Sequence, residues 1–271
     1  MSSGGYGVQG WHSDEEALPP KWVTLATLAH PTKRWLWSLP LHREVAAVVE
    51  LTSLYSDKPM TAIDVGSGYG LWTALLAGEG IQTVGIERDM ERVQWARDHF
   101  GSAKATYHCA SIDAVAEKWS GCSIALVSWC PPGIDWRSEM TTLAPQLLWE
   151  IGMPGGVGTS VPTHYRMVAR WRSPSWVDVL NAALAHWHAG RGEGNIRWLP
   201  EGSTVNTVFA REERLTTAVK IAWARRWQVA WKATIQAPEG YPWEAGYAAL
   251  GLLPATPTVT GERLWDIELF D

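Results

Sequence analysis

The strongest chemical pattern in the sequence is a glycine loop that directly follows an acidic residue. Asp64 and Val65 precede the range Gly66–Gly70, which reads Gly-Ser-Gly-Tyr-Gly. Glycines at these positions allow the backbone to turn sharply and to approach a ligand closely. The N–H groups of a helix that starts after the loop can then meet the ligand. The pattern predicts a binding site for a nucleotide-like molecule.

Two carboxylates beside the loop indicate a ligand that carries positive charge. Asp64 would repel a pyrophosphate, whereas it would attract an ammonium or a sulfonium group. Glu87 follows Gly70 by seventeen residues, and a carboxylate there can accept hydrogen bonds from both hydroxyls of a ribose. The glycine spacing also differs from the dinucleotide pattern Gly-x-Gly-x-x-Gly, since Leu71 occupies its last glycine position.

Strands and helices are expected to alternate over about seventy residues around this loop. Buried strands are predicted over residues 61–65, 83–87, 105–109 and 123–129, and helices over 71–77, 90–100 and 112–118. This alternation predicts an α/β fold with a parallel sheet and helices on both faces. The loops that follow the strands would then meet at one edge of the sheet, where the glycine loop and Glu87 lie.

The segment resembles the class I, Rossmann-like S-adenosylmethionine-dependent methyltransferases. The resemblance is carried by Asp64–Gly70 and by Val84–Arg88, and it covers about residues 61–133. It implies that the glycine loop packs under the methionine and ribose of S-adenosyl-L-methionine, that Glu87 binds the ribose hydroxyls, and that 110–113 covers the adenine. The cofactor-binding residues implied in this way are Asp64, Gly66, Ser67, Gly68, Tyr69, Gly70, Glu87, Arg88, Ser111, Ile112, Asp113, Ser128 and Trp129.

The end of the fourth predicted strand would lie beside the transferable methyl group in this family. The segment 128–133 reads Ser-Trp-Cys-Pro-Pro-Gly, which is distantly similar to the (Asp/Asn/Ser)-Pro-Pro-(aromatic) motif of amino-methylating enzymes. Cys130 is a poor hydrogen-bond acceptor at the position before the prolines, and Gly133 replaces the stacking aromatic residue. Ser128 and Trp129 would have to substitute for both groups from the other side of the motif.

The catalytic residues are not identified by any motif, and four side chains are candidates. Ser128 lies at the end of the fourth predicted strand. His30 and His42 belong to a segment that, by family analogy, folds over the cofactor, and a histidine there has a pKa suited to a general base. Tyr55, close to the first strand, is a similar candidate.

The remaining chain is expected to elaborate this core. Residues 1–57 are predicted to form a mobile arm and an N-terminal helical cap, and residues 58–271 the methyltransferase domain with a C-terminal substrate elaboration. In the C-terminal half, helices are predicted over 141–151 and 176–186, and partly antiparallel strands over 204–209, 219–223, 230–235 and 264–270.

Composition narrows the class of protein further. The 271 residues are 46% hydrophobic and 19% charged, with a net charge of −5, which mildly disfavours a nucleic-acid partner without excluding one. No apolar run is long enough for a membrane span and no signal peptide is recognisable, so a cytoplasmic protein without membrane contact is expected. The three cysteines include no Cys-x-x-Cys pair, and His186 and His188 would point to opposite faces of a helix. The sequence therefore predicts no metal site.

Four functions are compatible with these features. The leading interpretation is a methyltransferase for a small-molecule acceptor, because the chain is acidic and has 19 tryptophans, a few of which could line a pocket for a flat or cationic substrate. A nucleic-acid amino-methyltransferase, a protein methyltransferase and a non-catalytic S-adenosylmethionine-binding module are the alternatives. The sequence leaves the acceptor and the oligomeric state open.

Overall fold

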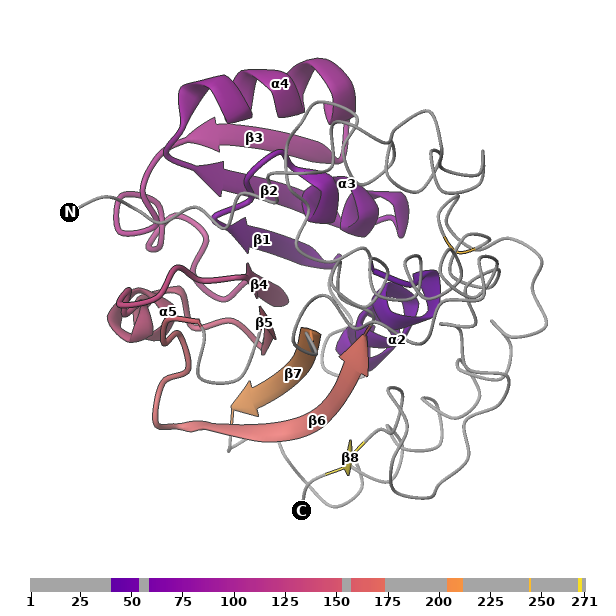
Figure 1. The fold of residues 1–271 in the computed structure, drawn as a ribbon, viewed down its shortest axis with the longest axis vertical. Helices are drawn as coiled ribbons and strands as arrows, with labels where there is room; N and C mark the ends of the chain where they lie inside the picture. Colours follow the sequence, from indigo (N-terminus) through magenta and orange to yellow (C-terminus); the bar gives the residue numbers. More distant parts are fainter. Residues whose placement is uncertain are drawn as a thin grey trace, which may run out of the picture.

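A computed structural model of the chain describes residues 40–53, 59–152, 157–173, 204–211, 244 and 268–269. Within these residues a single sheet has the strand order β3-β2-β1-β4-β5-β7-β6-β8 (Figure 1). The strands are β1 (Thr61–Val65), β2 (Gln82–Glu87), β3 (Ala105–Cys109), β4 (Ile124–Ser128), β5 (Leu147–Gly152), β6 (Tyr165–Ser173), β7 (Thr204–Arg211) and β8 (Glu268–Leu269). The helices are α2 (His42–Ser53), α3 (Leu71–Gly78), α4 (Met90–Phe100) and α5 (Arg137–Leu143).

The direction of the strands identifies the fold. Strands β1 to β5 are mutually parallel. Strand β7 runs antiparallel to both β5 and β6, and β8 runs antiparallel to β6. This order, with one reversed strand inserted beside β5, is the Rossmann-like sheet of class I methyltransferases. The expectation of a parallel core with a partly antiparallel C-terminal part is confirmed.

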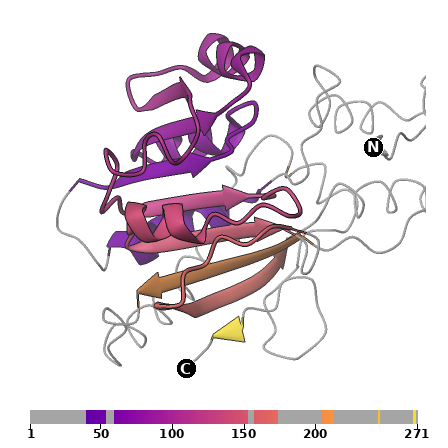
Figure 2. The same ribbon diagram turned by 90° about the vertical axis from the view of Figure 1, so that its left-hand side faces the viewer.

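Helices cover both faces of the sheet, as Figures 1 and 2 show. Side chains alternate along β1, so Ile63 and Val65 pack in the cluster that contains Met140 and Leu143 of α5. Asp64 points to the other face and reaches Thr73 of α3. One strand therefore brings an acid to the α3 face while its apolar residues fill the core below α5.

Helix α2 is attached to the sheet by a buried carboxyl group. Glu44 is fully buried, and it accepts hydrogen bonds from the Leu41 backbone N–H (2.9 Å), from Trp171 Nε1 (3.0 Å) and from the Ser173 hydroxyl. Asn206 extends this network by donating to Ser173 Oγ, at 2.6 Å. Burial raises the pKa of Glu44 to about 7. The N-terminal part of the described chain is therefore fixed to β6 by polar contacts as well as by packing.

Replacing Glu44 with glutamine should lower the free energy of unfolding by about 1 kcal/mol at about pH 6, because the amide nitrogen cannot accept the Leu41 N–H. A pKa raised on folding stabilises the folded state below the unfolded pKa and loses that contribution as pH rises through about 7. The difference between wild type and Glu44→Gln should therefore shrink towards about pH 8.5. Urea unfolding at both pH values measures it, and a difference that grows with pH would contradict the assignment.

Two predicted helices are wrong. Residues 112–118 form successive turns, in which Val115 N–H and Ala116 N–H both donate to Ile112 O. Ile112 and Ala116 are the buried residues of this stretch, and a single turn is enough to bury such an i, i+4 pair. Val115 and Trp119 extend this apolar face, but the backbone hydrogen bonds change between i−3 and i−4 acceptors, so the segment forms successive turns instead of one helix.

The prediction of a helix over 141–151 merged two elements. Helix α5 ends at Leu143, and Ala144 has a left-handed φ of 46° before Pro145, which cannot continue a helix. The following apolar run is β5, and its side chains are buried on both faces, as is usual for a parallel strand inside a sheet. Strand β7 confirms the strand predicted over 204–209, whereas β6 was not predicted.

Other predicted elements lie partly or wholly outside the described residues. Helix 176–186 and the strands over 219–223 and 230–235 lie outside them, and of 264–270 only β8 is described. Most of the predicted N-terminal arm and cap also lies outside, and α2 is its described part.

Candidate functional site

A cavity of about 610 Å³ lies at the C-terminal ends of β1 to β4. Its volume is in the range of sites for small ligands. It is lined by Asp64, Val65, Gly66, Ser67, Gly68, Tyr69, Trp72, Ile86, Glu87, Arg88, Arg92, Ala110, Ser111, Ile112, Ser128, Trp129, Pro131, Ile134 and Trp136. Because the strand order is known, the lining has a β2–β3 side with Glu87 and Ser111 and a β4 side with Ser128 and Trp129.

The glycine loop is tied to the neighbouring strand. Gly66 N–H and Ser67 N–H both donate to Ile86 O, at 2.9 and 3.0 Å. Gly68 has a left-handed φ of 54°, and a Cβ added there would meet no heavy atom within 4 Å. The backbone therefore faces open space beside the cavity, as a loop that holds a ligand against its backbone requires.

Two of the predicted cofactor-binding residues do not line the cavity. Gly70 is buried, and a Cβ there would lie 2.5 Å from Tyr107 Cε1, so this glycine allows β3 to pack against the start of α3. Asp113 has an exposed carboxylate that accepts a hydrogen bond from the Ser111 side chain, which lowers its pKa. The prediction that Asp113 contacts adenine has no support in this geometry.

Asp64 is a buried acid whose two carboxylate oxygens differ in their hydrogen bonding. Its side chain is 1% exposed, and Oδ2 accepts a hydrogen bond from Thr73 Oγ1 at 2.7 Å. Oδ1 has no hydrogen-bond partner among the residues that the structure describes. Burial raises the pKa of Asp64 to about 7, and the nearby charge of Glu87 acts in the same direction. A cation in the cavity would pair with this oxygen and favour the ionised form.

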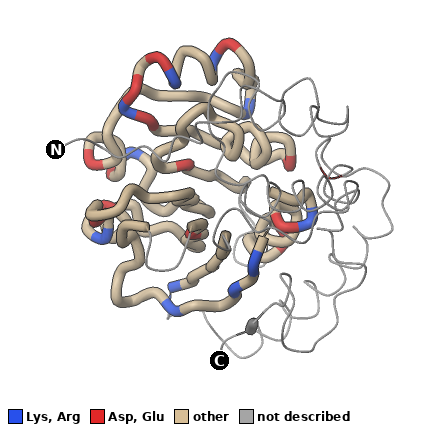
Figure 3. Tube along the Cα trace, viewed as in Figure 1, with Lys and Arg blue, Asp and Glu red and all other residues tan. Residues whose placement is uncertain are grey.

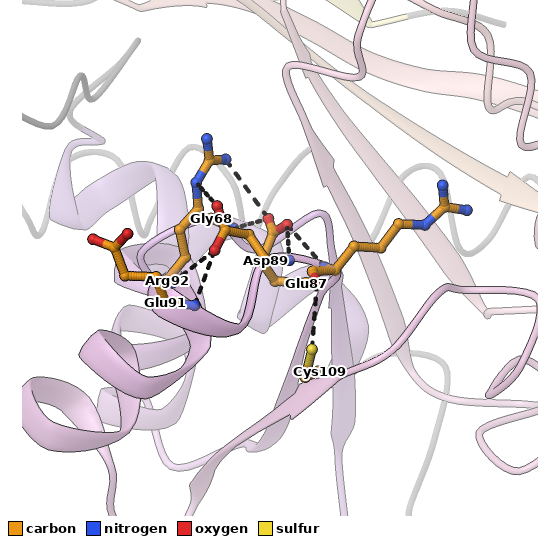
Figure 4. Close-up of polar contacts among 7 residues, drawn as sticks. Gly68, Glu87, Asp89, Glu91, Arg92 and Cys109 are labelled. Atoms are coloured by element: carbon orange, nitrogen blue, oxygen red, sulfur yellow. Dashed lines mark hydrogen bonds and ion pairs between the residues drawn. The ribbon is translucent and has the colours of Figure 1, made fainter.

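Glu87 organises the backbone around it (Figure 4). Its Oε2 accepts the Gly68 N–H at 3.0 Å, and its Oε1 accepts the N–H groups of Arg88 and Asp89 at 2.8 and 3.0 Å. A carboxylate can accept about four hydrogen bonds, so roughly one acceptor position remains for a ligand. Glu87 thus holds the glycine loop and still offers an oxygen to the cavity.

Arg92 lines the same side of the cavity and was missed by the sequence reasoning. Its guanidinium lies 5.6 Å from the centre of the Tyr69 ring and forms an ion pair with Asp89 at 3.4 Å. It approaches Glu87 Oε2 at 4.0 Å (Figure 4). Arg92 is the third residue of α4, and the packing of α4 beside β2 and β3 brings it to the cavity. No spacing signal in the sequence indicates such a contact.

The β4 side of the cavity is apolar and aromatic. Ser128 and Trp129 line it as expected, and Pro131, Ile134 and Trp136 join them. The Cys130 side chain is buried, and burial raises the pKa of its thiol to about 11, with a further contribution from Glu150. Cys130 therefore remains a thiol inside the protein and does not take the place of a polar amine-binding residue.

Of the other catalytic candidates, His42 is the one that the structure describes, and it does not line the cavity. His42 begins α2, and its Nε2 lies 3.0 Å from Glu79 Oε1, away from the lining residues. His30 and Tyr55 lie outside the described residues. Ser128 is therefore the one proposed catalytic candidate that the described structure brings to the cavity.

In the described ranges no cluster of three or more His, Cys, Asp or Glu side chains is arranged to bind a metal ion. None of the helices in these ranges has the length and apolarity of a membrane span.

Arginines gather on β6 and β7 (Figure 3) at Arg166, Arg170, Arg172 and Arg211, and β5 separates these strands from β4.

Comparison with known proteins gives distant structural similarity and no sequence match. The sequence matches no protein-family model and no curated protein. WbdD, crystallised with the kinase inhibitor LY294002, is 14% identical with a TM-score of 0.40, and the match covers 63% of this chain and 40% of WbdD. The SAM-dependent methyltransferase of Agrobacterium tumefaciens is 10% identical with a TM-score of 0.36, covering 63% of this chain and 62% of that one.

A third solved structure contains two bound compounds. The plantazolicin methyltransferase BpumL, in complex with a triazolic desmethyl-plantazolicin analogue and S-adenosylhomocysteine, is 12% identical with a TM-score of 0.42. The match covers 71% of this chain and 91% of BpumL. The chain spans less than two thirds of the WbdD length, and all three TM-scores are below 0.5. Because these similarities are weak, the fold is identified by the strand order and the glycine loop of this chain.

Proposed function

We propose that this protein binds S-adenosyl-L-methionine in the cavity at the ends of β1 to β4 and transfers its methyl group to a small-molecule acceptor. The observation that carries the proposal is the Asp64 carboxyl group, which is buried beside the cavity with one oxygen unpartnered among the described residues. Leaving such an oxygen unpaired is costly, and a cationic ligand removes that cost. The glycine loop and Glu87 are the other parts of the proposed cofactor site.

The residues present fit this cofactor. Asp64 would hold the ammonium of the methionine part, the open backbone at Gly68 would pass under it, and the remaining acceptor position on Glu87 would take a ribose hydroxyl. Ser111 and Ile112, which follow β3, would cover the base.

When bound, S-adenosyl-L-methionine would supply an electrophilic methyl carbon to an acceptor lone pair, and its sulfur would keep the electron pair of the broken carbon–sulfur bond. The chain contributes binding, orientation and exclusion of water. Ser128 can orient the acceptor through its hydroxyl group, which both donates and accepts hydrogen bonds.

Replacing Glu87 with alanine should weaken binding of S-adenosylhomocysteine by about 1–3 kcal/mol, because the ribose loses an acceptor and Gly68 N–H loses its partner. Isothermal titration calorimetry measures the change. Glu91→Ala is the matched control, since Glu91 is an exposed carboxylate in the first turn of α4 and does not line the cavity. Equal affinities of wild type and Glu87→Ala would refute the ribose assignment.

A nucleic-acid acceptor remains the alternative, and the arginines on β6 and β7 are the observation in its favour. They lie beyond β5 from the cavity, so a nucleic acid bound there would still have to reach the β4 side. Binding of a DNA and an RNA oligonucleotide at low and high salt distinguishes the two proposals. A small-molecule enzyme should show no binding with a steep salt dependence.

A further inference from the structure

Three tryptophans line the cavity, and two of them come from the loop after β4. We call Trp129 and Trp136 the indole wall. Trp72, on α3, approaches from the other face of the sheet and lies edge-on to Trp149, with ring centres 5.1 Å apart. The ring of Trp136 reaches back to the glycine loop, where its Cη2 atom lies 3.4 Å from a Cβ placed on Gly66. The β4 side of the cavity is thus walled by flat, apolar rings.

Backbone hydrogen bonds fix the wall before any ligand enters. Trp129 N–H donates to Ile151 O at 2.7 Å, and Trp136 N–H donates to Thr159 O at 2.7 Å. Between them, Ile134 N–H donates to Pro131 O at 3.1 Å, and Thr159 N–H donates to Ile134 O at 2.9 Å. A site that is already ordered loses little conformational entropy when a ligand binds.

The backbone of Trp129 is strained. Its φ of 56° is in the left-handed region, which is unfavourable for a residue with a side chain. Glycine would relieve this strain, yet a tryptophan occupies the position and lines the cavity. Strained residues of this kind are found where the side chain has a functional role.

Charge distribution separates the two sides of the cavity. The lining cations, Arg88 and Arg92, belong to the β2 side with Glu87. Within the lining residues of the 128–136 segment, the polar groups are the hydroxyl of Ser128 and the indole N–H groups of Trp129 and Trp136, and no side chain is charged. A multiply charged anion would find no positive group among the residues that line the β4 side, whereas a flat ring with one polar atom would match it.

We propose that the acceptor is a flat aromatic compound, held against Trp129 and Trp136, whose nucleophilic oxygen or nitrogen contacts Ser128. The proposal rests on the proposed methyl transfer, because the β4 side lies next to the site assigned to the cofactor. It assigns the specificity of the enzyme to two residues of the β4 loop.

The test compares aromatic probes with saturated counterparts of similar size. Calorimetry on protein saturated with S-adenosylhomocysteine would measure binding of 1-naphthol and 2-naphthol against decahydro-1-naphthol and decahydro-2-naphthol, which keep the two rings and the hydroxyl. The aromatic compounds should bind at least about tenfold more tightly. Trp129→Gly should remove that preference, and Trp129→Phe should keep part of it. Trp119→Phe, which changes a tryptophan packed on the core, should have no effect.

A further readout separates binding from folding. The urea midpoint of unfolding of Trp129→Gly should stay close to that of wild type, since relief of the left-handed strain offsets the lost contacts. Equal binding of aromatic and saturated probes, or an unchanged preference in Trp129→Gly, would overturn the proposal. Failure of wild type to bind S-adenosylhomocysteine would instead overturn the proposed function, and the same probes titrated into the ligand-free protein would still test the wall.

Discussion

Replacing Asp64 with asparagine is expected to weaken binding of S-adenosylhomocysteine about a hundredfold while the ligand-free protein stays folded. Asparagine keeps an oxygen for Thr73 Oγ1 but places a neutral amide where the unpartnered Oδ1 lies. The ammonium of the ligand would then lose its charged partner in a buried position. Calorimetry on wild type and Asp64→Asn at pH 8 measures the loss.

The pH dependence gives an independent check on Asp64. Its pKa is raised to about 7 on folding, so its contribution to stability is present below the unfolded pKa and is lost as pH rises through about 7. From about pH 5 to about pH 8 the ligand-free wild type should therefore lose stability relative to Asp64→Asn. Ligand affinity of wild type should rise over the same range, because a cation favours the ionised carboxylate. Parallel stability curves would show that Asp64 titrates normally.

Replacing Gly70 with alanine is expected to destabilise the protein by roughly 3 kcal/mol or more. The new Cβ would lie 2.5 Å from Tyr107 Cε1 and 2.8 Å from Ala96 Cβ, and the φ of 80° is unfavourable for alanine. Strand β3 and helix α4 would have to move away from the loop. Urea unfolding measures the loss of stability.

Gly68→Ala is the matched partner of that variant. It has the same unfavourable backbone region, with φ of 54°, but its Cβ would meet no atom within 4 Å. It should cost only about 1 kcal/mol of stability and should weaken ligand binding, because the methyl group enters the space beside the cavity. If Gly70→Ala were as stable as Gly68→Ala, the structural role assigned to Gly70 would be wrong.

The central part of the fold could be predicted from the sequence because its signals are local. The buried strand before the glycine loop, the loop itself and the acid at the end of the next strand each follow from a few neighbouring residues. Parallel strands then bring Asp64, Glu87 and Ser128 to one edge, so these residues meet at the cavity as expected.

Features that depend on tertiary packing could not be read in this way. Gly70 belongs to the same glycine pattern as Gly68, but its function in packing is visible only once Tyr107 lies on it. Arg92 and Trp136 reach the cavity from helix positions or helix ends that carry no motif. The helix predicted over 141–151 failed because a continuous apolar run fits a buried strand and a helix equally well.

The most direct test of the account is a calorimetric titration of the purified protein with S-adenosyl-L-methionine and with S-adenosylhomocysteine. The account predicts that both bind at one site per chain with dissociation constants in the micromolar range, on the order of 1–10 µM, and that Asp64→Asn and Glu87→Ala weaken both. Absence of binding by either compound at about 50 µM, with the protein folded, would contradict it.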